Sequence, residues 1–413
     1  MNHRTPRIVS LGLLFLGVGF LGVGAPLAGQ SFVDLIDSRN VVQPYASVFQ
    51  VEGGVIGTTA SNLNSEVGSM RPAEGNGSRG LDDQISWDAR AYFRDEAFGS
   101  RRGTLEAYAG RDGIFAGYTD GKLVGDDTLT RFEVHARPWQ FYRDGFYKDG
   151  ELQPNGFYDG ADYEGYIGFG REAQQGLYVE FGPFYKQLSF QRSRLTDNPF
   201  NPQFTIPTDY NAYGGRLYLE QSTVQMDRRR GLPRDGFAVT IIGEREWNDS
   251  SGAFGRPGIF TTELPSAVWR LRGRLEWYIP GSETAMWEVF ANGGWNDEKD
   301  RVQNFEAQHP LGNQWADAQL RLRLHLGQSM TLTPFFQAQY SRVLDENGGG
   351  SSKDFFFGGG VESYLHFSEA VSLHAWYSYV DNENRPSIRV DEDVHGEQMF
   401  YLGMVLRLGA TRR

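Results

Sequence analysis

The residues whose types and spacing could do chemistry are charged side chains that recur at every second position. Residues 267–278 and 315–326 show this most clearly, and shorter charged runs lie near them in the sequence. The set comprises Arg270, Arg272, Arg274, Glu276, Glu244, Glu246, Glu288, Asp317, Arg321 and Arg323. Because a β-strand points successive side chains to opposite faces, each group lies on one face of its strand.

These charges have two interpretations, which the sequence leaves open. One is a pore lining, in which arginines opposite carboxylates create a field that filters solutes by charge. The candidate selectivity residues are then Arg270, Arg272, Arg274, Arg321 and Arg323. The other is a lattice of cross-strand ion pairs that fills or stiffens the interior, with each pair contributing about 0.2–1 kcal/mol.

The opposite faces of the same segments are apolar, as Leu320, Leu322 and Leu324 illustrate. An arginine facing lipid at mid-depth would cost about 2–4 kcal/mol, so the charged faces must point into a lumen. Similar alternation recurs along the chain in segments of the length that a tilted strand needs to cross a membrane. We therefore expect an all-β protein, an antiparallel transmembrane β-barrel of about 14 strands, with 12 to 16 as the range.

Loops and aromatic residues favour this barrel over a soluble β-sandwich. Short connections such as 279–282, 327–329 and 368–369 alternate with long ones such as 248–265, 296–312 and 381–395. Aromatic rings gather at strand ends, where outer-membrane barrels carry girdles at the lipid boundary. The expected girdle residues are Trp247, Trp277, Tyr278, Trp287, Trp295, Tyr340, Phe367 and Tyr379.

Composition excludes several other classes of protein. The chain has no cysteine, so it has no disulfide, thiolate metal site, cysteine nucleophile or lipoprotein anchor. Its formal net charge of −12 disfavours a nucleic-acid partner. We expect no cofactor and no metal site.

The N-terminus has the three parts of a secretory signal peptide: basic residues, an apolar run and a stretch of small residues. We therefore assign residues 1–29 to a signal peptide and 30–82 to a periplasmic or plug segment with a linker. Residues 83–409 are assigned to the transmembrane barrel and 410–413 to a C-terminal tail. The expected location is the outer membrane, reached by export through the periplasm.

Two segments resemble known families. Gly403, Leu406 and Leu408 are spaced as in the C-terminal assembly signal of outer-membrane proteins, which implies recognition by the barrel-assembly machinery. The sequence Gln-Met-Asp-Arg-Arg-Arg-Gly-Leu-Pro-Arg-Asp-Gly-Phe of residues 225–237 resembles a turn of the BamA/TamA surface-antigen superfamily. Residues 269–280 and 354–379 are also similar to later strands of that superfamily. However, its periplasmic domains and its Arg-Gly-Phe or Arg-Gly-Tyr loop triplet are not found.

We expect no enzymatic activity. His135, His325, His366 and His374 fall in expected strands, without the local motif of outer-membrane phospholipases. An acidic outer loop at 381–395 leaves an omptin-like protease as an open alternative, and a solvated surface or weak cation site is the simpler interpretation.

The leading functional hypothesis is passive passage of small polar or ionic solutes through a charged lumen. The alternatives are a surface-antigen-type barrel that assembles or exports proteins or lipids, and a non-conducting surface or adhesive barrel. The expected partners are outer-membrane lipids, lipopolysaccharide and the assembly machinery, and assembly into a homo-oligomer is left open.

Overall fold

A computed structural model describes residues 45–411 apart from 59–84, 101–102, 111–112, 122, 125–127, 149–150, 175, 193–204, 228–229, 231, 259, 298–312, 345–350 and 382–396. Sixteen antiparallel strands form one closed barrel wall. They are β1 (Tyr45–Thr58), β2 (Ile85–Asp95), β3 (Gly103–Gly110), β4 (Gly113–Asp120), β5 (Leu129–Lys148), β6 (Glu151–Gln174), β7 (Leu177–Arg192), β8 (Tyr210–Ser222), β10 (Leu232–Asn248), β13 (Ala267–Pro280), β14 (Ala285–Asn296), β15 (Gln314–Leu326), β16 (Met330–Leu344), β17 (Ser351–His366), β18 (Val371–Val380) and β19 (Glu397–Thr411).

Each wall strand pairs with its neighbours in the chain, and β1 closes the ring by pairing with β19 from Tyr45↔Thr411 to Thr58↔Met399. Closure leaves no open sheet edge between the first and last strands, which a barrel in lipid requires. Three short strands lie outside the ring. β9 (Gln225–Asp227) pairs with the start of β10, and β11 (Ala253–Arg256) pairs with β12 (Phe260–Glu263).

The two faces of the wall differ sharply in chemistry. Large apolar side chains point outward and are exposed, as Phe336, Leu402 and Met404 show, with 51–56 % of each side chain accessible. The inward positions of the same strands are mostly polar and buried. This inversion of the usual soluble pattern, with the apolar side chains on the outside, is that of a barrel whose outer face contacts lipid. Among the described residues, no helix is long and apolar enough to cross a membrane.

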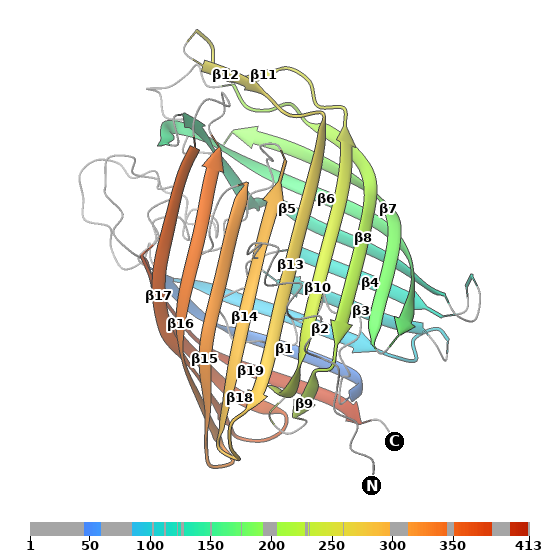
Figure 1. Ribbon diagram of the computed structural model, residues 1–413, viewed down its shortest axis with the longest axis vertical. Helices are drawn as coiled ribbons and strands as arrows, with labels where there is room; N and C mark the ends of the chain where they lie inside the picture. The colour runs from blue at the N-terminus through green and yellow to red at the C-terminus, as the bar shows by residue number, and fades with distance from the viewer. Residues whose placement is uncertain are drawn as a thin grey trace.

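The two ends of the barrel carry different connections. Turns 281–284, 327–329 and 367–370 lie at one end, and the long connections 249–266 and 297–313 lie at the other. Figure 1 shows β9 at the first end and β11 and β12 at the opposite end. Because short turns face the periplasm in outer-membrane barrels, we call the first end the periplasmic end and the second the outer end.

The barrel prediction is confirmed, with sixteen strands at the upper limit of the expected range. β4 was not expected, and residues 41–56, which contain most of β1, were left open between a strand and part of a plug. β1 lies inside the segment 30–82 that was assigned to a plug or linker, so the wall begins at Tyr45 and not at residue 83. β4 follows β3 with only residues 111–112 between them, and one strand, beginning near Gly103, was expected in this region. At the other end of the chain, β19 continues to Thr411, into the expected tail.

Most of the expected girdle points outward, and Tyr278 does not. Trp247, Trp277 and Trp287 expose 44–49 % of their surface on the outer face. Tyr278 instead faces the lumen, where only 1 % of it is exposed and its hydroxyl donates to Glu276. Its position one residue from Trp277 explains the error, since neighbours on a strand point to opposite faces. The expected signal peptide lies outside the described residues.

Candidate functional site

The charged residues expected to share the inner face are brought together as ion pairs. Arg270 of β13 lies 2.6 Å from Glu246 and 3.6 Å from Glu244 on the neighbouring strand β10. Lys186 of β7 and Arg216 of β8 contact the same carboxylate Glu244, at 3.5 Å and 2.6 Å. Lys186 also lies 3.8 Å from Glu246, so each of the two carboxylates has more than one cation beside it.

A second cluster surrounds Glu288 of β14, which is fully buried. The Nε of Arg321 donates to Glu288 at 3.0 Å, and the Nη2 of Arg321 pairs with Glu362 of β17. Arg323, two residues further along β15, also pairs with Glu288. Burial of this kind is stable only while each charge keeps its partners, so the cluster ties β14, β15 and β17 together.

The remaining candidates occupy three different environments on the inner face. Arg274 pairs with Glu276 on its own strand. Asp317 is buried and accepts a hydrogen bond from the Nε2 of Gln337 at 2.7 Å. Arg272 shares the inward face of β13 with Arg270 but is exposed, and its charge acts on Glu244 of the neighbouring strand. Arg272 is therefore the candidate best placed to meet a molecule inside the lumen.

The seam between the first and last strands is fastened from inside. The ring nitrogens of His374 on β18 lie 2.6 Å from Glu52 of β1 and 2.9 Å from Glu362 of β17. Because a carboxylate only accepts hydrogen bonds, both ring nitrogens carry protons and the ring is a cation. Gly403 of β19 lies between β18 and β1 and faces inward, where a Cβ would collide with the hydroxyl of Tyr401.

The other two residues of the expected assembly signal, Leu406 and Leu408, point outward and expose 43 % and 54 % of their side chains. They lie on the lipid-facing side of β19. Their role in assembly remains a prediction.

The described residues 225–227, 230 and 232–235 fold inward and form what we call the mouth hairpin. They belong to the segment that resembles a turn of the surface-antigen superfamily. β9 pairs with the start of β10 through Leu232↔Asp227 and Pro233↔Met226. Gly236, with φ of 101°, turns the chain back into the wall at a point where a Cβ would collide with the carbonyl of Thr223. An L-amino acid with a side chain rarely adopts this conformation, so the glycine is required at this bend.

The mouth hairpin crosses the periplasmic end of the barrel. Leu232 is 4 % exposed and packs with Tyr364 of β17 and Val405 of β19. In the wall order β10-β13-β14-β15-β16-β17-β18-β19, these strands lie five and seven places from β10, in a ring of sixteen. The hairpin thus contacts the side of the wall almost opposite to the one from which it starts.

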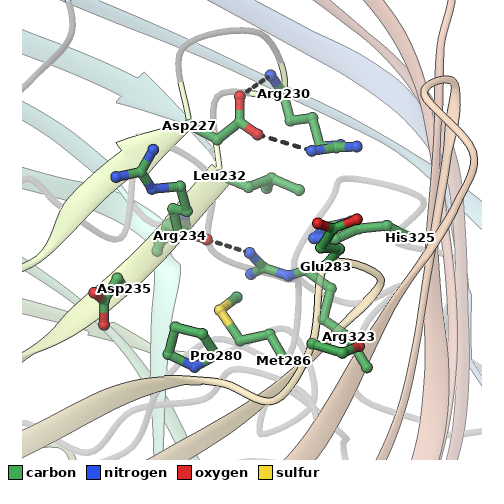
Figure 2. A pocket seen from close by; sticks show the side chains of 13 residues that line it. Asp227, Arg230, Leu232, Arg234, Asp235, Pro280, Glu283, Met286, Arg323 and His325 are labelled. Atoms are coloured by element: carbon green, nitrogen blue, oxygen red, sulfur yellow. Dashed lines mark hydrogen bonds and ion pairs between the residues drawn. The ribbon is translucent and has the colours of Figure 1, made fainter.

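Three arginine bonds to backbone carbonyls hold the mouth hairpin in this position. The Nη1 of Arg323 donates to the carbonyl of Pro233 at 2.5 Å (Figure 2). The Nη1 of Arg407 on β19 donates to the carbonyl of Arg230 at 3.3 Å. Arg230 itself pairs with Asp227 at 2.8 Å and reaches the carbonyl of Gly327 at 3.5 Å. Arg323 therefore joins the hairpin directly to the Glu288 cluster.

Sequence reasoning identified residues 225–237 as a motif but did not assign them to the lumen, and it missed Arg407, His374 and Glu52 as partners. The acidic loop 381–395 lies almost entirely outside the described residues. No group of three or more His, Asp or Glu residues in the described part of the chain is arranged to hold a metal ion.

The closed wall, the lipid-facing apolar surface and the polar interior together define an outer-membrane β-barrel. No protein-family model matches the sequence, and no curated protein matches it. Among solved structures the barrel is similar to CdiB from Acinetobacter baumannii, with 9 % identity and a TM-score of 0.51, covering 89 % of this chain and 60 % of that one.

Two further similar structures are BamA from Haemophilus ducreyi lacking POTRA domains 1–3 and CdiB from Escherichia coli. The first has 12 % identity and a TM-score of 0.49, covering 97 % of this chain and 78 % of that one. The second has 10 % identity and a TM-score of 0.48, covering 89 % of this chain and 64 % of that one. The chain thus spans less than two thirds of the length of either CdiB, and identities this low show a shared fold alone.

Proposed function

We propose that this chain is a gated outer-membrane barrel that assembles or exports a macromolecule, and that it is closed at rest. The observation that carries the proposal is the mouth hairpin, which crosses the periplasmic end and contacts β15, β17 and β19. A channel for free diffusion of small solutes needs a lumen that is open without a partner. The similarity of the fold to that of CdiB also supports a barrel that assembles or exports a macromolecule.

The proposed route runs through the lumen and not through the seam between β1 and β19. That seam has thirteen register pairs and is bridged by Glu52 and His374. The hairpin is held by fewer contacts, so displacing it requires less free energy than separating two fully paired strands. The charged residues that line the wall then act mainly as a lattice that keeps the barrel rigid while the hairpin moves.

Single-channel conductance of the refolded mature chain in a planar lipid bilayer tests closure. Removing residues 225–235 leaves four residues between Ser222 and Ala238, which are already register partners, so a short hairpin loop can replace the segment. We expect the wild-type chain to be silent and this deletion to show stable open steps. Open steps in the wild type that change when Arg270, Arg272 and Arg274 are neutralised would contradict the proposal and support the small-solute channel.

A matched deletion at the outer end controls for general damage to the barrel. Removing residues 250–264 also leaves four residues, here between the register partners Trp247 and Ala267. We expect this variant to stay silent. If both deletions conduct, or neither does, the mouth hairpin is not the element that closes the barrel.

Passage of a macromolecule is tested by photo-crosslinking in living cells. A photoreactive residue at position 272 faces the lumen, and one at Leu320, which is 48 % exposed on the outer face, serves as the control. A polypeptide or lipid client should be captured at 272 and not at 320. Capture at neither position, in cells that express the deletion of 225–235 as well, would count against export through the lumen.

A further inference from the structure

An arginine on the outer face of the barrel is held between two tryptophan rings. Arg245 lies on β10 two residues before Trp247, so both side chains point outward from the wall. The guanidinium carbon of Arg245 lies 5.5 Å from the ring centre of Trp247 and 5.1 Å from that of Trp269 on β13. A cation over an aromatic face is attracted by the ring, so the two indoles keep this charge at one place on the lipid-facing surface.

The hydrogen-bond donors of Arg245 are not filled by the described part of the chain. A guanidinium group carries five N–H donors, and no described residue accepts a hydrogen bond from this one. Its ion pair with Asp297 spans 3.6 Å, which is longer than a hydrogen bond. The Oδ1 of Asp297 already accepts a hydrogen bond from the backbone nitrogen of Trp269 at 2.7 Å. Since 24 % of the Arg245 side chain is exposed, an anion at the membrane boundary can reach these donors.

Arg245 lies at the depth of the lipid head groups of the outer leaflet. Trp247 and Trp269 are exposed, and Tyr213 of β8 stacks on Trp247 with the ring centres 6.2 Å apart. Exposed aromatic rings of this kind mark the boundary between membrane and water in outer-membrane barrels. β10 ends at Asn248, at the outer end of the barrel. The anionic group within reach of Arg245 is therefore the head group of an outer-leaflet lipid.

The wall beside Arg245, towards the middle of the membrane, has room for an acyl chain. Register pairs Arg245 with Gly215 of β8, which has no side chain. Gly243 also faces outward, and a Cβ at that position would meet no atom within 4 Å. Its register partner Leu217 is apolar and 42 % exposed. An acyl chain below a head group at Arg245 would thus lie on bare backbone and an apolar side chain.

We propose that Arg245, with Trp247 and Trp269, binds a phosphate group of lipopolysaccharide, and that an acyl chain of the same molecule lies over Gly243. Lipopolysaccharide fills the outer leaflet and carries both phosphates and acyl chains. Two N–H groups of the guanidinium donate to two phosphate oxygens, a bidentate geometry that lysine cannot form. A phosphate carries more negative charge than the carboxylate of Asp297 and offers more acceptor oxygens, so it holds the cation more closely. The site lies outside the lumen, and the inference is therefore independent of the proposed function.

Fluorescence anisotropy of dye-labelled lipopolysaccharide, added to the refolded full chain in detergent micelles, tests the site. We expect saturable binding that weakens at least tenfold when the lipopolysaccharide is dephosphorylated. Arg245→Gln should weaken binding at least fivefold. The matched control is Arg171→Gln, which removes an exposed, outward-facing arginine at the periplasmic end of β6 and should leave binding unchanged. Equal losses in the two variants, or binding that does not depend on the phosphates, would overturn the proposal.

A second variant tests the acyl chain and keeps Arg245 in place. Gly243→Phe covers the open surface without a backbone clash and should weaken binding of lipopolysaccharide at least threefold. Unchanged binding would show that no acyl chain lies there and would overturn this part of the proposal. Competition separates the possible sources of phosphate. Phosphatidylglycerol or inorganic phosphate that competes at the affinity of lipopolysaccharide would show a site for any anionic lipid or for the free ion, and either result would overturn the assignment.

Discussion

In the part of the chain that the structure describes, each end of the barrel carries a short hairpin, and the two are held in opposite ways. The hairpin formed by β11 and β12, which we call the rim hairpin, inserts Phe254 into an apolar cluster with Leu188, Phe190 and Tyr210. These residues belong to β8, which pairs with β10 in the wall, and to β7, the next strand along. The mouth hairpin depends instead on arginine–carbonyl bonds and on Leu232, and its partners lie across the lumen.

This difference separates a structural element from a movable one. Burying a phenylalanine side chain stabilises by about 1.5–3 kcal/mol through contacts that water cannot replace. Hydrogen bonds to carbonyl groups can be exchanged for bonds to water or to a client, so they can be broken and remade. The rim hairpin is therefore built to stay in place, and the mouth hairpin is built to be displaced. Hydrogen–deuterium exchange of residues 225–235 and 253–263 measures the two hairpins in the same experiment.

Glu288→Gln is expected to cause the largest loss of stability. Removing this carboxylate leaves Arg323 without its buried partner and leaves Arg321 with Glu362 alone. Breaking a buried ion pair in this way typically destabilises by about 3–5 kcal/mol. Because Arg323 also holds Pro233, the mouth hairpin should exchange much faster while the rim hairpin stays protected. The urea midpoint of unfolding should fall as well. Unchanged exchange in 225–235 would mean that the Glu288 cluster does not support the hairpin.

Phe254→Ala should reverse the pattern. Truncating a buried phenylalanine costs about 3–5 kcal/mol, and here the loss falls on the rim hairpin alone. Residues 253–263 should lose their protection, and the bilayer conductance should remain silent. The matched change Leu232→Ala should instead loosen residues 225–235 and produce open steps. If Phe254→Ala opened the barrel, the outer hairpin would share the gating role.

Alternation of side chains was enough to predict the barrel and the inward face of β13 and β15, since that pattern is local. It left β1 open between a strand and a plug, because its outer face is interrupted by Gly53 and Gly57. It missed β4, which only residues 111–112 separate from β3. The crossing of the lumen could not be predicted. Arg407 and Arg230 are 177 residues apart in the chain, and no spacing rule links them.

A smaller effect is expected from Arg407→Gln. Its bond to the carbonyl of Arg230 is 3.3 Å long, so we assign it about 1.5 kcal/mol, the lower end for a hydrogen bond from a charged donor. Exchange in residues 225–235 should then rise about tenfold, because 1.4 kcal/mol corresponds to a factor of ten. Arg245→Gln is the matched control at the outer end and should leave this exchange unchanged. Equal hydrogen-exchange rates of residues 225–235 in the two variants would show that Arg407 does not hold the mouth hairpin.

The smallest effect concerns the base of the rim hairpin, where Asp249 accepts hydrogen bonds from the backbone and side-chain nitrogens of Asn211 at 2.6 Å and 3.2 Å. These bonds, the backbone one first, lower the pKa of Asp249 below its usual value of 3.8. Its contribution to stability is therefore present above pH 3.8 and is lost as the pH falls through the lowered pKa. Because Asp249 is exposed, the change is modest. Protection of residues 253–263 from hydrogen exchange should decrease slightly on acidification in the wild type, and Asp249→Asn should reduce that dependence on pH.

The mouth hairpin is the control for this prediction. No described contact joins it to Asp249, so its hydrogen exchange should be the same in the variant and in the wild type at every pH. A shift there would mean that the two ends of the barrel are coupled and that the hairpins do not move independently.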